Sequence, residues 1–79
     1  MFINKSDSGK NNICGEQVTK FRKDKGMSQR ALADALQIAG LDVDKNAIQR
    51  IESGKRFVTD IELKFFSTVL ETSLDELLK

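Results

Sequence analysis

The sequence predicts an all-α fold, a compact bundle of about five short helices. Apolar residues recur at spacings of three and four, and no segment shows the alternating pattern of a strand. Serine, threonine and aspartate stand directly before several of these apolar runs, as N-caps do, and no proline interrupts the chain. With 79 residues, the chain has room for one domain with a small core.

The N-terminal segment differs from the rest of the chain. Residues 1–12 are polar and have no apolar period, so we expect a flexible arm there and a folded domain over residues 13–79. The arm has no apolar run of signal-peptide length, and nowhere does the chain reach the roughly 20 apolar residues that span a membrane. Cys14 is the single cysteine, so no internal disulfide can form, and a reducing cytoplasm is the expected compartment.

Two helices are expected in the first half of the domain. The first covers residues 15–25 and ends at Gly26. The second begins after the N-cap Ser28 and continues to Ala39, where Gly40 stops it. The side chains expected to face inward from these helices are Cys14, Val18, Phe21, Leu32, Ala33 and Leu36.

Capping residues also mark the helices of the second half. Asp44 caps a short third helix that closes at Gly54, Thr59 caps a fourth, and Ser73 caps a final turn. A glutamate follows three residues after Thr59 and after Ser73, which is the spacing of a capping box. The inward side chains of the third and fourth helices are Ile48, Ile51, Leu63, Phe66 and Leu70, and the final turn carries Leu74, Leu77 and Leu78.

Two charged residues fall on inward helix faces. Arg22 follows the apolar pair of the first helix, and Glu52 follows that of the third, each at about 100° from its neighbour. A single buried charge is costly, so we expect Arg22 and Glu52 to form an ion pair across the helix interface. The alternative is that each side chain extends separately to water.

The outer face of the third helix is rich in hydrogen-bond donors. It shows Lys45, Asn46, Gln49, Arg50 and Ser53. Asparagine and glutamine can form paired hydrogen bonds to adenine, and lysine or arginine can bind the acceptors of guanine. Lys55 and Arg56 follow in the next loop, where they can reach phosphate, and Gln29 at the start of the second helix can contact another phosphate. Taken singly, each of these residues also fits an ordinary solvated surface.

The distribution of charge along the chain agrees with a DNA-binding face better than the net charge does. The net charge is only +1, which alone does not indicate a nucleic-acid partner. Residues 44–58 contain four basic and two acidic residues, whereas residues 59–79 contain five acidic residues and two lysines. A domain with this dipole can turn one end toward phosphates, although solvated surface explains the same charges.

Two blocks of sequence resemble a known family. Residues 21–33 read FRKDKGMSQRALA and residues 48–56 read IQRIESGKR. Together they resemble the Cro/lambda-repressor type of helix-turn-helix regulator, the XRE family, and the similarity covers about residues 15–78, including SLDEL at residues 73–77. The resemblance implies sequence-specific binding of double-stranded DNA and transcriptional regulation, most simply repression.

The resemblance also assigns roles to individual residues. The segment 28–36 would be the positioning helix and the segment 45–53 the recognition helix. Gln29 would contact the DNA backbone; apart from the resemblance, we expect Ser53, Lys55 and Arg56 to be further phosphate contacts because of their position at and after the end of the recognition helix. Lys45, Asn46, Gln49 and Arg50 would occupy the base-reading positions, and the core arginine–glutamate pair of the family falls on Arg22 and Glu52.

The turn between the two motif helices departs from the family pattern. Leu36 and Val43 stand seven positions apart where the family has two, so the segment 37–42 contains about five extra residues. We expect residues 37–39 to lengthen the second helix and Leu41 to pack over the joint. The extended turn changes the tilt expected for the recognition helix.

Catalysis has little support in the sequence. The chain contains no histidine or tyrosine, and Cys14 has no histidine base to activate it. Neither Gly-Lys pair completes a phosphate-binding loop, because Gln49 and Asn4 stand where the first glycine is required. With no histidine and one thiol, the usual zinc sites are excluded. We therefore expect no enzyme activity, no cofactor and no metal.

The fourth helix carries a second apolar stripe. Ile61, Phe65 and Val69 lie away from its core-facing residues, and such a helix is either buried or faces a partner. We expect these residues to contribute to a homodimer, which would place two recognition helices roughly 34 Å apart on DNA. Alternatively, Phe2 and Ile3 or the chain end cover the stripe. A third interpretation is a protein-interaction module that holds an unidentified protein, as an antitoxin holds its toxin.

Overall fold

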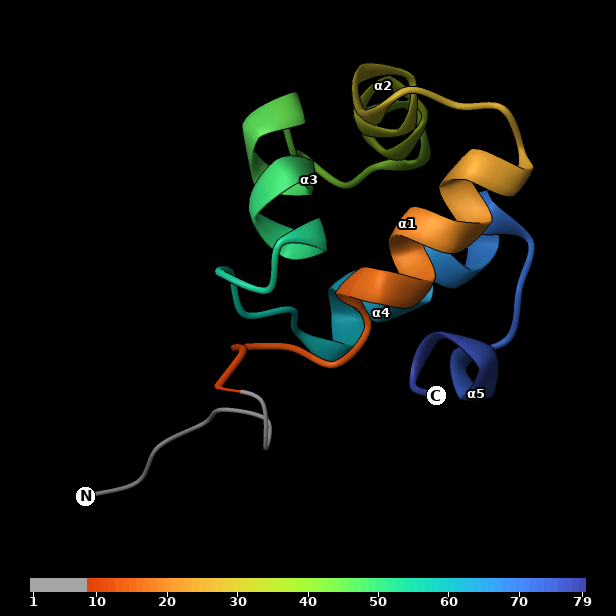
Figure 1. Ribbon diagram of the computed structural model, residues 1–79. Helices are drawn as coiled ribbons and strands as arrows, with labels where there is room; N and C mark the ends of the chain where they lie inside the picture. The colour runs from red at the N-terminus through yellow and green to blue at the C-terminus, as the bar shows by residue number, and fades with distance from the viewer. Residues whose placement is uncertain (1–8) are drawn as a thin grey trace.

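Five helices and no strand form the part of the molecule that the computed structural model describes, residues 9–79. The helices are α1 (Gly15–Asp24), α2 (Gln29–Ala39), α3 (Lys45–Glu52), α4 (Asp60–Leu70) and α5 (Leu74–Leu77). In Figure 1, α2 and α3 stand side by side at the top, α1 lies below them in front of α4, and α5 lies at the bottom beside the C-terminus. The all-α prediction and the order of its helices are confirmed.

The helix starts follow the predicted caps. Ser28, Asp44 and Thr59 each accept a hydrogen bond from a backbone N–H in the first turn of α2, α3 and α4. The capping box of α4 is complete, because Glu62 also accepts from the N–H of Thr59. Ser73 caps α5, but the carboxylate of Glu76 accepts a hydrogen bond from Lys79 instead of returning to the cap.

Apolar residues from all five helices meet in one core. Its fully buried members include Val18, Leu32, Leu36, Ile48, Ile51, Phe66 and Leu77. Phe21 and Leu63 are half-buried at the edge of this core. Of the three leucines in the last turn only Leu77 is buried, because the single turn of α5 presents one side to α1 and α4.

The connection between α2 and α3 is longer than a tight turn. α2 continues to Ala39, as expected, and ends at Gly40, whose φ of +115° is a left-handed conformation that favours glycine. Leu41 packs against the core. Gln37 holds the connecting loop in place by donating a hydrogen bond from Nε2 to the carbonyl oxygen of Val43 at 2.7 Å. The extra residues therefore form an ordered bridge between the two helices.

The last residues of the expected N-terminal arm contact the helical domain. Asn11 and Asn12 form hydrogen bonds with the end of α3 and the loop that follows it. Residues 1–8 of the predicted arm, including Phe2 and Ile3, lie outside the described residues. Within the described part of the chain no helix is long and apolar enough to cross a membrane.

Candidate nucleic-acid interface

A buried ion pair joins α1 to α3. The Nε and Nη2 of Arg22 donate to the two carboxylate oxygens of Glu52 at 2.6 and 3.0 Å, while Nη1 donates to the carbonyl oxygen of Met27 at 2.7 Å. The side chains of Arg22 and Glu52 are only 10% and 7% exposed. The predicted pair is confirmed, and it fixes the rotation of α3 about its own axis because Glu52 must point inward.

Hydrogen bonds keep Glu52 ionised despite its burial. Burial raises the pKa of this carboxyl, but hydrogen bonds from Arg22, Gln29 and Thr19 outweigh it, so the net pKa lies below the ordinary value. Gln29, the first residue of α2, contributes by donating from Nε2 to Glu52 at 3.1 Å. The residue that the resemblance assigns to a phosphate contact is thus half-buried and also couples α2 to the ion pair.

Four side chains on the outer face of α3 have no hydrogen-bond or ion-pair partner among the described residues. Lys45, Asn46, Gln49 and Arg50 are all exposed, and none of these side chains bonds to another residue in the described part of the chain. On the opposite side of α3, Ile48 and Ile51 are completely buried. The structure therefore brings the four predicted base-reading residues onto one solvent-facing surface, with their donors directed away from the core.

The loop after α3 holds two basic residues in different environments. Lys55 is exposed, and no ion pair with another described residue occupies its ammonium group. Ser53 is also exposed, at the C-terminal end of α3, where its hydroxyl donates to the carbonyl oxygen of Arg50 at 3.1 Å. Both side chains lie next to the α3 face.

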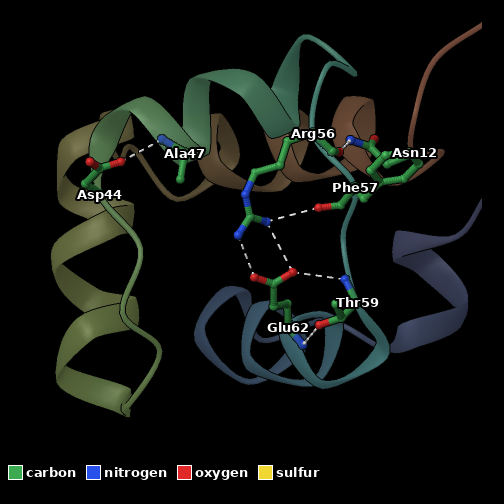
Figure 2. Close-up of polar contacts among 7 residues, drawn as sticks. All are labelled: Asn12, Asp44, Ala47, Arg56, Phe57, Thr59 and Glu62. Atoms are coloured by element: carbon green, nitrogen blue, oxygen red, sulfur yellow. Dashed lines mark hydrogen bonds and ion pairs between the residues drawn. The ribbon is translucent and has the colours of Figure 1, made fainter.

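Arg56 differs from the expectation that it is equivalent to Lys55. Its guanidinium donates to both carboxylate oxygens of Glu62 at 2.8 and 3.2 Å and to the carbonyl oxygen of Phe57 at 3.1 Å (Figure 2). The hydrogen bond from Arg56 lowers the pKa of Glu62, and the same contact raises the pKa of Arg56. Arg56 therefore joins the loop to the capping box of α4.

The N-terminal segment fastens the same loop, which the sequence did not indicate. Asn12 donates from Nδ2 to the carbonyl oxygens of Ile51 and Arg56 at 3.1 and 2.7 Å and accepts from the N–H of Gly15 at 2.9 Å. Asn11 donates to the carbonyl oxygen of Lys55 at 2.9 Å. An asparagine shortly before a helix hints at the local bond to Gly15, but nothing in the sequence reveals contacts across 44 residues.

The second apolar stripe of α4 is only partly exposed. Ile61 is 66% exposed, whereas Phe65 and Val69 are half-buried against the core. A hollow of about 370 Å³ lies between α4 and the end of α2, lined by Ala39, Ile61, Lys64, Phe65 and Thr68. Ile38, on the lengthened part of α2, is 89% exposed.

Among the described residues, no group of three or more cysteines, aspartates or glutamates is arranged to hold a metal ion. Cys14 is buried, and burial raises the pKa of its thiol. This thiol is a core side chain with no access to solvent.

Comparisons with known proteins agree with this geometry. The model of the helix-turn-helix family matches residues 18–77, which include all of α2 and α3. A comparison with curated protein sequences gave no match.

Two solved structures resemble the chain closely in backbone. The restriction-modification controller protein C.AhdI from Aeromonas hydrophila is 26% identical, with a TM-score of 0.70 over 81% of this chain and 86% of its own. The clp gene regulator ClgR from C. glutamicum is 27% identical, with a TM-score of 0.73 over 85% of this chain and 80% of its own. The chain belongs to the XRE-type helix-turn-helix family of DNA-binding transcription regulators.

Proposed function

We propose that the chain recognises a specific duplex DNA site by placing α3 in the major groove. The observation that carries this proposal is the set of four exposed, unpaired donor side chains on α3: Lys45, Asn46, Gln49 and Arg50. An α-helix with its side chains is about 10–12 Å across, which suits a major groove about 12 Å wide. The buried pair Arg22–Glu52 holds that face outward, so reading requires no rearrangement of the helix.

Phosphate contacts in this proposal flank α3. Lys55 would bind a phosphate beyond the C-terminal end of α3, with Ser53 beside it. A second phosphate would bind at the N-terminus of α2, where Gln29 is the first residue and free backbone N–H groups favour an anion. Arg56 is assigned chiefly to the loop, because Glu62 already holds its guanidinium. Phosphate contacts fix the position of the helix, and base contacts on α3 select the sequence.

Selection from randomised duplexes tests the proposal directly. Purified full-length chain is incubated with the pool at low and at physiological salt, and bound DNA is sequenced. We expect a short site to be enriched, with stronger enrichment at the higher salt because non-specific binding weakens there. A bound fraction with the composition of the input pool at both salt concentrations would contradict sequence-specific reading.

We infer that the active form is a homodimer. Ile61 exposes aliphatic surface at the hollow of α4, and Ile38 is exposed on the last turns of α2; exposed apolar surface of this kind favours association. A two-fold pair of domains would suit a near-palindromic site. Sedimentation velocity over a range of concentrations is expected to show a dimer that Ile61→Asp shifts toward monomer. A strict monomer at high micromolar concentration would reject the dimer.

Repression is the regulatory outcome that we propose. A domain of this size can block RNA polymerase simply by occupying a site that overlaps a promoter, and it needs no catalytic activity to do so. Transcription in vitro from a promoter carrying the selected site is expected to fall as protein is added. A rise in transcript would instead indicate activation.

The exposed surface of Ile38 and Ile61 also supports a second candidate, an adaptor that binds another protein. Salt-sensitive duplex binding separates the two candidates. The DNA proposal requires it, and an adaptor that acts without DNA does not.

A further inference from the structure

The loop that carries Lys55 is fastened by the N-terminal segment through its backbone. The carbonyl oxygens of three consecutive residues, Gly54, Lys55 and Arg56, accept hydrogen bonds from Asn11 N, Asn11 Nδ2 and Asn12 Nδ2 at 2.8, 2.9 and 2.7 Å. Every one of these bonds joins segments more than 40 residues apart in the chain.

The opposite edge of the loop is held by α3. The N–H groups of Lys55 and Arg56 both donate to the carbonyl oxygen of Arg50, at 2.8 and 3.3 Å. Peptide planes on both sides of Lys55 are therefore fixed, one edge by α3 and the other by the N-terminal segment. Because the planes are fixed, the direction in which the Lys55 side chain leaves the backbone is fixed as well.

The contact is close as well as directional. Gly54 has a φ of +81°, and a β-carbon there would lie 2.7 Å from Cγ of Lys10, so the aliphatic stem of Lys10 lies directly on this glycine. Asn11 and Asn12 thus act as a clamp on the loop 54–56. Asn12 also accepts a hydrogen bond from the N–H of Gly15 at 2.9 Å, which joins this clamp to the first turn of α1. The clamp thus links the start of α1 to the end of α3.

We propose that Asn11 and Asn12 are positioning residues for DNA binding: they hold the loop 54–56 so that Lys55 meets a phosphate. The inference rests on the proposed phosphate contact of Lys55. Asn12 contributes more than Asn11, because its three hydrogen bonds are partly buried, whereas the bond from the Asn11 side chain is exposed.

The test measures DNA affinity and its salt dependence. Substitution of a residue that only stabilises the fold changes neither quantity as long as the protein remains folded. Full-length parent, Asn11→Ala, Asn12→Ala, Lys55→Ala and Asn12→Ala/Lys55→Ala are titrated into a fluorescent mixed-sequence duplex of roughly 21 base pairs, two helical turns. Anisotropy is recorded between about 50 and 200 mM salt. Circular dichroism verifies at each condition that the variants are folded.

Ser73→Ala is the matched control for a general loss of stability. It removes the N-cap of α5, which lies away from α3, and is expected to lower the melting temperature without changing DNA affinity. Asn11→Ala, which keeps its backbone bond to Gly54, guards against the case in which Asn12→Ala fails to fold.

The inference predicts a specific pattern. Lys55→Ala should flatten the log–log salt slope by about one unit and weaken binding roughly five- to tenfold at 0.1 M salt. Asn12→Ala should cause most of this change in salt slope and affinity, and Asn11→Ala a smaller change. The double variant should bind DNA no more weakly than Lys55→Ala alone.

Three results would overturn the inference, and each has a distinct meaning. Additive losses in the double variant would show that Asn12 acts independently of Lys55. Parent-like slopes in Asn11→Ala and Asn12→Ala, with a reduced slope in Lys55→Ala, would remove the positioning role and leave the proposed function intact. Absence of binding by the parent itself would instead contradict the proposed function.

Discussion

At the residue scale, Arg22 and Glu52 determine how α3 is presented. Their side chains are almost fully buried and their charges satisfy each other, with Met27 and Gln29 completing the hydrogen bonds. Removal of either partner leaves the other charge buried without a counterion. That situation is costly because water cannot reach the group to replace the lost partner.

Arg22→Ala or Glu52→Ala is therefore expected to lower the free energy of unfolding by about 3–5 kcal/mol, a large share of the stability of a small domain. Thermal and urea denaturation of the purified variants would measure the loss. Lys25→Ala serves as the control, because it removes an exposed pair with Glu71 and should have little effect. Melting temperatures unchanged in both core variants would show that the pair contributes nothing to folding.

Glu52 and Glu62 also predict how stability depends on pH. The pKa of each is lowered in the folded state, that of Glu62 mainly by the hydrogen bond from Arg56. The unfolded chain then binds protons more readily than the folded one, so this stability is complete above about pH 5 and is lost as pH falls through the folded-state pKa values.

Glu62→Gln tests the sign of this effect. The variant should be less stable than the parent at pH 7, and the difference should narrow as the pH falls from about 5 toward 3, because protonation removes the same charge from the parent. Chemical denaturation at a series of pH values measures the gap. A gap that stays constant over that range would mean that the carboxylate of Glu62 does not titrate in the way described.

At the element scale, the loop between α3 and α4 assigns different tasks to two neighbouring basic residues. Lys55 extends into solvent, whereas Arg56 turns back to Glu62 at the start of α4. Figure 2 shows that this carboxylate also accepts from the N–H of Thr59, so one glutamate organises both the loop and the helix. A substitution of Arg56 should therefore affect the stability of the domain more than it affects DNA affinity.

Arg56→Ala is accordingly expected to destabilise the domain by about 1–3 kcal/mol, whereas Lys55→Ala should leave the melting temperature within the range of ordinary surface changes. Parallel thermal melts of the two single variants make the comparison. Equal melting temperatures, together with equal losses of DNA affinity, would restore the original expectation that both residues simply contact phosphate.

The elements themselves were predictable because their determinants are local. Ser28, Asp44 and Thr59 cap the helices that the sequence assigned to them, and Gly40 ends α2. The ion pair was also predictable, because two opposite charges on inward faces have few other ways to be satisfied. In each case the deciding interaction lies within one helix turn or between two core-facing positions.

At the scale of the whole molecule, the contacts that the sequence did not reveal are those set by three-dimensional placement. The bonds from Asn11 and Asn12 to the loop 54–56 join distant segments and follow no period. Likewise, the tilt of α3 against α2 depends on how residues 40–44 bridge them, and sequence spacing alone does not determine that path. Phe65 of α4 is half-buried and lies close to Gly40 at the end of α2, whereas Ile61, also on α4, stays exposed, a difference that the shared apolar stripe does not indicate.

The central claim is that the outer face of α3 reads base pairs, and base-pair discrimination by Asn46→Ala tests it most directly. Affinities of parent and variant are measured on the selected site and on duplexes with each single base-pair change. We expect the variant to lose about 1–3 kcal/mol on the selected site and to stop discriminating at one position, while mixed-sequence DNA is bound as before. An equal loss on every duplex, with discrimination retained at all positions, would contradict base reading by this helix.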